Sequence, residues 1–412
     1  MGEAGARERV DPQGECDLAI VGAGIIGLAL ARELTERDPR LSVTVLEREG
    51  EVGFHQTGHN SGVVHAGIYY TPGSLKARMC VEGARRLYEF CEQSGVVHER
   101  CGKLIVARDA SELGRLEELE RRGHANGVEG LRRLTAAQLE QVEPHCRGVA
   151  ALLSPATGIA DFGGVARALA GEIAGRGVRV ATGAGVEGVS LGGRRIVLRH
   201  ARGETRARFA AFCAGGWSDR LAVMAGAPAD PRIVPFRGAY LALRPDRREL
   251  VRSLIYPVPD PALPFLGVHL TRHAGGDVLV GPTALLAGAR DAYALGRVRR
   301  EDVYSTLSWP GSWRMLRRYW RAGLTEVGHA ASRRAFVRAA AAYVPALTVE
   351  DVEPAFAGVR AQALARDGKL VDDFVVHATE RALHVRNAPS PAATSSLALA
   401  GLIADRVQEG MG

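Results

Sequence analysis

Residues 17–27 have the sequence Asp-Leu-Ala-Ile-Val-Gly-Ala-Gly-Ile-Ile-Gly, which joins a short apolar run to three closely spaced glycines. The apolar pattern predicts a strand over 17–21, a helix over 28–36 and a second strand over 42–46. An acid, Glu47, follows the second strand directly. Strand, glycine turn, helix, strand and acid in this order are typical of a βαβ unit that binds a dinucleotide. The sequence therefore predicts an α/β fold of the Rossmann-like type.

Each residue type of this turn has a physical role in nucleotide binding. Gly22 permits the tight turn, and Gly24 lets the backbone approach a pyrophosphate at the positive end of the helix. Gly27 lets the helix pack closely on the strand, and Glu47 is placed to accept hydrogen bonds from an adenosine ribose. An unphosphorylated ribose favours FAD or NAD over NADP, and these four residues leave FAD and NAD both open. The alternative is a glycine-rich packing turn that binds no nucleotide.

The composition is that of a globular protein long enough for two domains or two interleaved lobes. The chain has 412 residues, 46% hydrophobic and 24% charged, and no apolar run predicts a transmembrane helix. A net charge of +7 suits an anionic substrate or an anionic membrane face, and we predict no nucleic-acid partner. Residues 1–16 carry no signal-type pattern and are predicted as an unstructured tail. We therefore expect a cytoplasmic protein, and the alternative is a cytoplasmic protein that contacts a membrane peripherally.

The cysteines and histidines do not predict a metal site. Six cysteines occur without a C-x-x-C pair, which argues against a zinc knuckle and a redox dithiol. His55, His59 and His65 have a spacing that could share a metal on a helix. Gly58 and Gly62 break a helix there, and no neighbouring acid or cysteine completes a ligand set. We predict no metal.

The rest of the chain alternates helices and strands around one long polar loop over 53–70. Helices are predicted over 74–94, 111–126, 135–142, 161–176, 298–343 and 394–408. Strands are predicted over 104–107, 178–181, 185–191, 195–199, 209–213, 233–243, 253–257, 267–271, 277–280, 371–379 and 382–385. The runs between 233 and 280 are separated by proline or glycine and predict an antiparallel sheet. A loop as long and polar as 53–70 is more often functional than idle.

Several segments together resemble one enzyme family. They are the glycine turn at 22–27, His55–Tyr70, Pro72–Ala77, Pro235–Gly238, Ile255–Pro261, Pro264–Arg272, Gly358–Gln362 and Asn387–Thr394. With these segments the chain resembles the L-2-hydroxyglutarate oxidase/dehydrogenase family, a branch of the D-amino-acid-oxidase-like FAD enzymes. The resemblance implies a non-covalently held FAD and oxidation of the C2 alcohol of an L-2-hydroxy acid, with L-2-hydroxyglutarate giving 2-oxoglutarate.

The resemblance also implies a domain plan and a set of cofactor contacts. A Rossmann-like FAD-binding domain, residues 16–80, 145–225 and 350–412, interleaves with an α+β substrate domain on an antiparallel sheet, residues 81–144 and 226–349. The residues implied at FAD are Gly22, Gly24, Ile25, Ile26, Gly27, Glu47, Arg48, Thr57, His59, Asn60, Ser61, Gly62, Val186, Ala214, Gly215, Trp217, Arg360, Ser390, Pro391, Ala392, Ala393 and Thr394. The last five open the C-terminal helix, whose positive end stabilises the negative charge of reduced flavin.

Flavin oxidation of an alcohol requires a base for the hydroxyl proton and a cation for the substrate carboxylate. Histidine suits the base near neutral pH, and we choose His65 first and His269 second. The alternative for both is a packed, hydrogen-bonded histidine. Arg360 is the first choice as cation, because a guanidinium binds two carboxylate oxygens at once. The weaker candidates, for a second carboxylate or a hydrogen bond to substrate, are Arg237, Arg272, Lys369, Tyr256 and Tyr70.

The sequence departs from the family pattern beside the expected substrate site. The family carries an acid where this chain has Ala239 and an asparagine where it has Thr283, and the stretch 287–293 replaces a lysine-bearing one. The substrate could therefore be a different hydroxy or amino acid. A flavin-binding module without turnover is the alternative from another class. For an enzyme, the expected partners are a small anionic hydroxy acid and, as acceptor, oxygen or a quinone or other electron carrier.

Residues 308–321 mix tryptophan, tyrosine and arginine. This composition suits a segment that lies in a membrane interface and passes electrons to quinone. The alternative is a solvated arginine face over a packed aromatic stripe.

Overall fold

The predicted βαβ unit is present at the start of the chain. The computed structural model describes residues 11–412, and the unit consists of β1 (Gly14–Val21), α1 (Ile25–Arg37) and β2 (Val43–Leu46). β1 starts inside the segment predicted as a tail, because Gly14 pairs with Thr205 and the ladder continues from there. The tail prediction is therefore wrong for residues 14–16, and residues 1–10 lie outside the described part of the chain.

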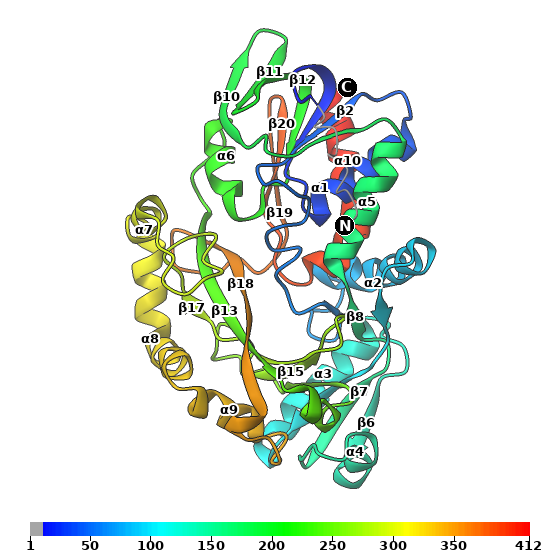
Figure 1. The fold of residues 1–412 in the computed structure, drawn as a ribbon, viewed down its shortest axis with the longest axis vertical. Helices are drawn as coiled ribbons and strands as arrows, with labels where there is room; N and C mark the ends of the chain where they lie inside the picture. The colour runs from blue at the N-terminus through cyan, green and yellow to red at the C-terminus, as the bar shows by residue number, and fades with distance from the viewer. Residues whose placement is uncertain (1–10) are drawn as a thin grey trace, which may run out of the picture.

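β1 lies inside a sheet that has eight strands within residues 11–412 (Figure 1). The order is β10-β11-β12-β1-β2-β9, with β20 joined to β12 and β19 joined to β20. The further strands are β9 (Arg179–Ala181), β10 (Val186–Gly192), β11 (Arg195–His200), β12 (Gly203–Phe212), β19 (Val375–Thr379) and β20 (Ala382–Asn387). Strands β20, β12, β1, β2 and β9 run parallel. Their carboxyl ends meet at one edge, where open α/β sheets bind ligands.

Both faces of this sheet are covered. On one face lie α1, α2 (Leu75–Ser94), α5 (Phe162–Gly175) and α10 (Ala392–Met411), which share a hydrophobic core with the strands (Figure 1). On the other face, α6 (Ser218–Met224) packs through Leu221. Burial on two faces explains why the central strands are continuous apolar runs rather than alternating ones.

The turn between β1 and α1 brings backbone segments into direct contact. A Cβ on Gly22 would lie 2.5 Å from the carbonyl oxygen of Cys213, and Gly22 has a φ of +108°. A Cβ on Gly27 would lie 2.1 Å from the carbonyl oxygen of Gly22. Only glycine fits these positions, so the turn role of Gly22 and the packing role of Gly27 are confirmed.

The second sheet contains the antiparallel strands predicted between 233 and 280. Within the described residues its order is β17-β13-β16-β15-β14-β5-β7-β6, with β18 paired to β13. The strands are β5 (Lys103–Ala107), β6 (Arg132–Thr135), β7 (Ala150–Ser154), β13 (Arg232–Leu243), β14 (Leu254–Pro257), β15 (His269–Arg272), β16 (Val278–Gly281), β17 (Leu285–Leu286) and β18 (Val352–Leu364). The single parallel pair among these ladders joins β14 to β5.

β18 has no counterpart among the predicted strands. Pro354 and Gly358 interrupt its apolar pattern, and pairing along nearly the whole of β13 holds it extended. β18 and β7 belong to the second sheet, although they fall in 350–412 and 145–225, which we assigned to the FAD-binding domain. The domain division remains a prediction, and the pairing places these two strands with the substrate domain.

The remaining elements lie outside the two sheets. They are α3 (Leu113–Ala125), α4 (Ala136–Val142), α7 (Arg300–Leu307), α8 (Pro310–Ala331), α9 (Arg333–Ala341) and a small sheet of β3 (Val63–Val64), β4 (His98–Glu99) and β8 (Gly158–Ala160). The helical prediction over 298–343 is confirmed as three successive helices, α7 to α9, along one outer edge (Figure 1). Pro310 opens α8, as is common at the first helical position.

We expect Gly27→Ala to destabilise the protein by about 1–3 kcal/mol and to weaken dinucleotide binding, because the new methyl group cannot fit against Gly22. Thermal unfolding and the amount of FAD retained after gel filtration measure the two effects. Gly171→Ala is the matched control, since Gly171 lies in α5 and an added Cβ there meets no atom within 4 Å. Equal behaviour of the two variants would contradict the packing role of Gly27.

Candidate active site

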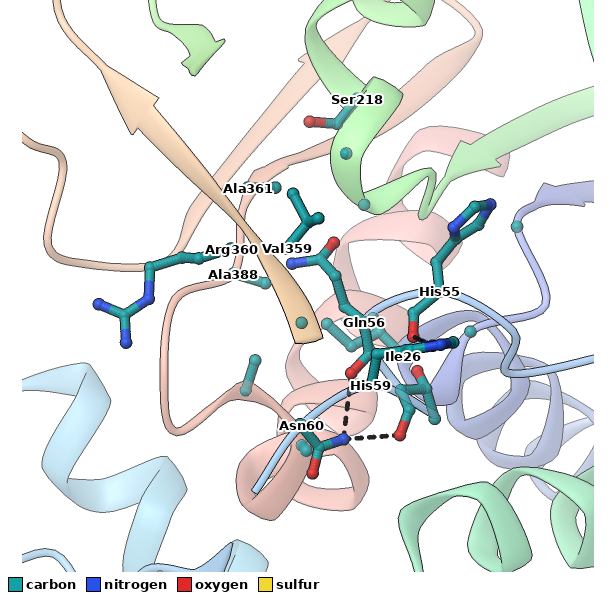
Figure 2. A pocket seen from close by; sticks show the side chains of 18 of the residues that line it. Ile26, His55, Gln56, His59, Asn60, Ser218, Val359, Arg360, Ala361 and Ala388 are labelled. Atoms are coloured by element: carbon teal, nitrogen blue, oxygen red, sulfur yellow. Dashed lines mark hydrogen bonds between the residues drawn. The ribbon is translucent and has the colours of Figure 1, made fainter. Parts of the chain in front are cut away.

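A cavity of about 700 Å³ lies where the carboxyl edge of the first sheet faces β13 and β18 of the second. All residues predicted at FAD belong to its wall except Gly27 and Gly62. Figure 2 shows the wall from close by, with the loop residues His55 to Asn60 on one side and β18 crossing them. One cavity therefore collects most of the predicted cofactor residues from segments far apart in the chain.

One end of the cavity is the start of α1. Gly24, Ile25 and Ile26 line it, and α1 has no side-chain cap at Gly24. Thr57 Oγ1 accepts a hydrogen bond from the Ile25 N–H at 3.1 Å, which ties the polar loop to this helix end. An added Cβ on Gly24 would meet only Thr57 Oγ1, at 3.4 Å, within 4 Å. A helix start that has no cap from its own N-cap residue and little side-chain bulk fits a pyrophosphate.

Glu47 lies beside this helix start, at the end of β2. Its Oε2 accepts from the Ala23 N–H at 2.8 Å and its Oε1 from the Glu49 N–H at 2.9 Å. Burial raises the pKa of this carboxyl, while the two backbone donors oppose that rise. The carboxylate keeps further lone pairs for ribose hydroxyls. Next to it, the Arg48 guanidinium lies 3.9 Å from the Trp217 ring centroid, and both residues line the cavity.

The polar loop is held by its own hydrogen bonds. Asn60 Nδ2 donates to the carbonyl oxygens of Gln56 and Thr57, as Figure 2 shows, and Asn60 Oδ1 accepts from the Gly62 N–H. His59 Nδ1 donates to the Phe54 carbonyl at 2.7 Å, and its ring stacks on Tyr293 with centroids 4.0 Å apart. Asn60 and His59 therefore shape the cavity wall, in addition to any contact with a ligand.

The start of α10 forms another part of the wall. Ser390, Ala392 and Thr394 line the cavity, and α10 has no side-chain cap. Thr394 Oγ1 accepts from the backbone N–H of His65 at 3.1 Å. This contact fixes the residue after β3 against the positive end of α10.

His269 is buried at the start of β15 and lines the cavity. Its Nδ1 lies 2.8 Å from the Gly267 carbonyl oxygen. A carbonyl oxygen only accepts hydrogen bonds, so Nδ1 carries the ring proton and Nε2 of the neutral ring has its lone pair free. Burial, together with the charges of Lys103 and Arg360 and against the hydrogen bond to Gly267, lowers the pKa of His269 to about 4. His269 is therefore neutral near pH 7.

His65 also lines the cavity. Its Nε2 lies 3.5 Å from Ser390 Oγ, and its Nδ1 is buried without a hydrogen-bond partner in the described structure. Burial lowers the pKa of His65 well below its usual 6.5, and the charge of Lys103 adds to this effect. The cavity wall thus carries two neutral histidines.

Arg360 projects from β18 into open space, away from the loop residues (Figure 2). Its guanidinium lies 4.7 Å from the Phe265 ring centroid. Among the described residues no carboxylate pairs with it. An unpaired guanidinium on an aromatic face in a cavity is suited to bind a carboxylate.

Several predicted residues lie outside the cavity wall. Lys369 is exposed and pairs with Asp367 at 3.5 Å, and Arg272 pairs with Glu99 at 2.6 Å. Arg237 donates to the Tyr293 carbonyl oxygen at 3.3 Å. Tyr70 and Tyr256 are also absent from the wall. The structure therefore brings His65, His269 and Arg360 into one wall, places Tyr256 directly behind His269, and leaves Lys369 and Arg272 in ion pairs outside the wall.

Ala239, which we expected beside the substrate site, does not itself line the cavity. Side chains alternate along β13, so Gly238 and Tyr240 line the cavity while Ala239 does not. The charges of the 287–293 segment are also engaged elsewhere: Arg290 pairs with Asp219, and Asp291 pairs with Arg297 and Arg299.

Sequence reasoning missed the apolar part of the wall, formed by Phe236, Tyr240, Phe265 and Leu266. Aromatic residues in strand-like segments usually belong to the core, so their composition alone gave no signal. Phe265 and Leu266 do lie in one of the quoted family segments. Metal ligands do not gather in this cavity: no three His, Cys, Asp or Glu side chains in residues 11–412 are arranged to hold an ion.

Comparisons with known proteins agree with this geometry. Residues 17–406 match the family model described as FAD dependent oxidoreductase. The chain is 46% identical to the mitochondrial L-2-hydroxyglutarate dehydrogenase of Homo sapiens over 95% of this chain and 89% of that protein. It is 42% identical to the L-2-hydroxyglutarate dehydrogenase of Indibacter alkaliphilus, over 94% and 97%.

Among solved structures, the chain is similar to an L-alpha-glycerophosphate oxidase from Mycoplasma pneumoniae with FAD bound. The TM-score is 0.76 at 24% identity, over 97% of this chain and 95% of that one. A glycine oxidase from Geobacillus kaustophilus gives a TM-score of 0.70 at 20% identity, over 96% and 95%. These two likenesses support the predicted fold class. With its glycine cradle, two-sheet cavity and near full-length relatives, the chain belongs to the FAD-dependent oxidoreductase family, in the branch of the L-2-hydroxyglutarate dehydrogenases.

Proposed function

We propose that this protein oxidises L-2-hydroxyglutarate to 2-oxoglutarate with FAD as cofactor. The observation that carries the proposal is the cavity itself, which places an unpaired guanidinium and two neutral histidines in one wall. The dehydrogenases named for this substrate match nearly the whole chain at 42–46% identity.

Different residues of the cavity have different roles in alcohol oxidation. Arg360 binds a carboxylate of the substrate and sets the orientation of C2. A neutral histidine accepts the hydroxyl proton at its free ring nitrogen. His269 has Nε2 free because Nδ1 is committed to Gly267, which makes it at least equal to His65 as the base. When bound, FAD would supply the two-electron acceptor that oxidation of the C2 alcohol to a carbonyl requires.

The other contacts organise this chemistry. The uncapped start of α10 presents its positive end to the cavity, where it favours the negative charge of a reduced cofactor. Phe236, Phe265 and Leu266 keep water from the reacting atoms and strengthen the charge interaction with Arg360.

Anaerobic mixing with a substrate panel tests the proposal. L-2-hydroxyglutarate is expected to bleach the flavin absorbance, while its D-enantiomer does not. Faster bleaching by another 2-hydroxy or 2-amino acid would assign a different substrate. A flavin that no small acid reduces would indicate the non-catalytic alternative.

Arg360→Met is expected to lower kcat/KM for L-2-hydroxyglutarate by about 100-fold: a bound carboxylate would cover the exposed guanidinium, and losing one partner of a buried charge pair costs roughly 2–5 kcal/mol. Most of the loss should be in substrate binding, and Arg360→Lys should recover part of it. Steady-state kinetics measure both. Arg272→Met is the control, because Arg272 pairs with Glu99 outside the cavity. A similar loss in the control would argue against Arg360 as the carboxylate site.

The acid limb of kcat/KM is expected well below pH 6.5. A histidine whose pKa is lowered stays neutral until the pH approaches that lowered value, which for His269 is about 4. The rate of anaerobic flavin reduction at low substrate, measured across pH, gives this limb. Replacing the true base by glutamine should cost at least about 100-fold and remove the limb, so His65→Gln and His269→Gln identify it. A limb at 6.5 would mean that neither histidine is held neutral.

We further propose that the electron acceptor is reached at a membrane surface, through what we call the α8 apolar face. This face consists of Trp313 and Leu316 before a kink at Tyr319 and of Trp320, Leu324 and Val327 after it, and all five are exposed. Trp313 is 58% exposed and Leu324 is 62% exposed. An apolar stripe that faces away from the protein supports an interfacial docking role.

The charge around this face supports an anionic lipid surface as its partner. Arg317, Arg318 and Arg321 are exposed beside the stripe, and no described carboxylate pairs with them. Arginine beside tryptophan suits the headgroup region, where the charge meets lipid phosphate and the ring lies at the acyl boundary. No helix in residues 11–412 is long and apolar enough to cross a bilayer. A membrane quinone is the acceptor that this surface would serve.

The Trp313→Ser/Trp320→Ser variant is expected to lose most binding to vesicles containing phosphatidylglycerol, while wild-type binding falls with added salt. Co-sedimentation measures binding, and turnover with a soluble dye should stay at the wild-type level. Val97→Ser, also an exposed apolar position, is the control. Reduction of a quinone in the same vesicles, compared with oxygen uptake, identifies the acceptor. Loss of self-association rather than vesicle binding would assign the face to a second copy of the chain.

A further inference from the structure

Lys103 is a buried lysine behind the active-site wall. It opens β5, is 1% exposed, and has no carboxylate partner among the described residues. Its Nζ lies 4.0 Å from the Tyr256 ring centroid and 4.4 Å from that of Tyr69. Cation–π contacts with these two rings thus partly replace the hydration that the ammonium group loses on burial. Burying an ammonium group this way is costly, and an apolar side chain of similar length would avoid that cost.

Tyr256 connects this cation to the cavity. The Tyr256 ring also stacks on His269, with centroids 4.1 Å apart and ring planes 26° apart. His269 is fixed from its other side by the bond from Nδ1 to the Gly267 carbonyl. Lys103, Tyr256 and His269 therefore form one continuous set of contacts that ends at the cavity wall.

No carboxylate in residues 11–412 forms an ion pair with Lys103. The titratable groups that interact with it are Cys80 from α2, Tyr69 after β3, Tyr256 from β14, and the two cavity histidines His65 and His269. The other nearby lysine, Lys76, pairs with Asp372 at 2.8 Å. The uncompensated positive charge behind the histidines is therefore that of Lys103.

The charge of Lys103 affects the pKa values of His65 and His269. Burial is the main cause of their lowered pKa values, and the charge of Lys103 lowers both further. Burial also lowers the pKa of Lys103 itself to about 7. Because the pKa of His269 is about 4, Lys103 is still charged over the range in which that histidine would take up a proton.

We propose that Lys103 is a positioning residue for the oxidation: in contact with Tyr69 and Tyr256, it keeps the His269 ring in place through the Tyr256 ring and adds a positive charge behind His65 and His269. The catalytic part of this statement rests on the proposed function. The charge effect on the histidines does not, and it is measurable without any substrate.

The test uses the FAD-loaded protein with Lys103→Met, Lys103→Gln and Lys103→Arg. Histidine NMR signals, assigned with His65→Gln and His269→Gln, give the two pKa values in the absence of substrate. Removing a nearby positive charge makes protonation easier, so both pKa values should rise by about one pH unit in the Met and Gln variants. Lys103→Arg should stay near wild type. The acid limb of kcat/KM should move to higher pH by the same amount.

Lys369→Met is the matched control, because Lys369 is exposed and paired with Asp367. If Lys103 serves only to support the fold, the variants lose thermal stability while the histidine pKa values stay in place, and that result overturns the proposal. If L-2-hydroxyglutarate does not reduce the wild-type flavin, the proposed function fails and the NMR titration still decides the role of Lys103. Should Lys103→Met not fold, Lys103→Gln provides the same comparison.

Discussion

The close backbone contact at the end of β1 is the constraint on which the rest of the structure depends. Gly22 meets the carbonyl group of Cys213 at the end of β12, and Gly27 meets that of Gly22 one helical turn later. A side chain at Gly27 would push α1 away from the end of β1, and one at Gly22 would push this turn away from the end of β12. Because the parts are this close, the uncapped start of α1, the acid at the end of β2 and the turn after β12 face a single cavity.

The second requirement is the long pairing of β13 with β18. It joins residues more than a hundred positions apart in sequence and places Arg360 opposite Phe236 across the ladder. The same pairing presents Gly358 and Tyr240 to the cavity and turns Ala239 away from it. The register of these two strands thus decides which side chains face the substrate end of the cavity. A shift of one residue would turn every side chain of the strand to the opposite face.

The cationic side chains near the cavity differ in whether an acidic side chain pairs with them. Arg290 is buried and its charge is paired: it donates to the Gly216 carbonyl at 2.6 Å and pairs with Asp219, while its backbone N–H donates to Asp302 of α7. This network holds the turn after β12 against the second sheet. Arg360 and Lys103, in contrast, have no acidic partner in the described structure, so their charge remains available to a bound acid and to the histidines.

The amino-acid sequence by itself determined the βαβ cradle, the cofactor class and many of the residues that line the cavity. Glycine spacing and apolar periodicity act between residues a few positions apart, and the family segments carried the same information for the polar loop and the start of α10. The tertiary structure decided β18, the apolar wall at Phe236 and Phe265, the separation of Lys369 from the cavity, and the contact of Lys103 with Tyr256 behind His269. Those features arise from strand pairing and burial among segments far apart in the chain. Local sequence patterns cannot encode them, because burial and side-chain direction are set only when the two sheets come together.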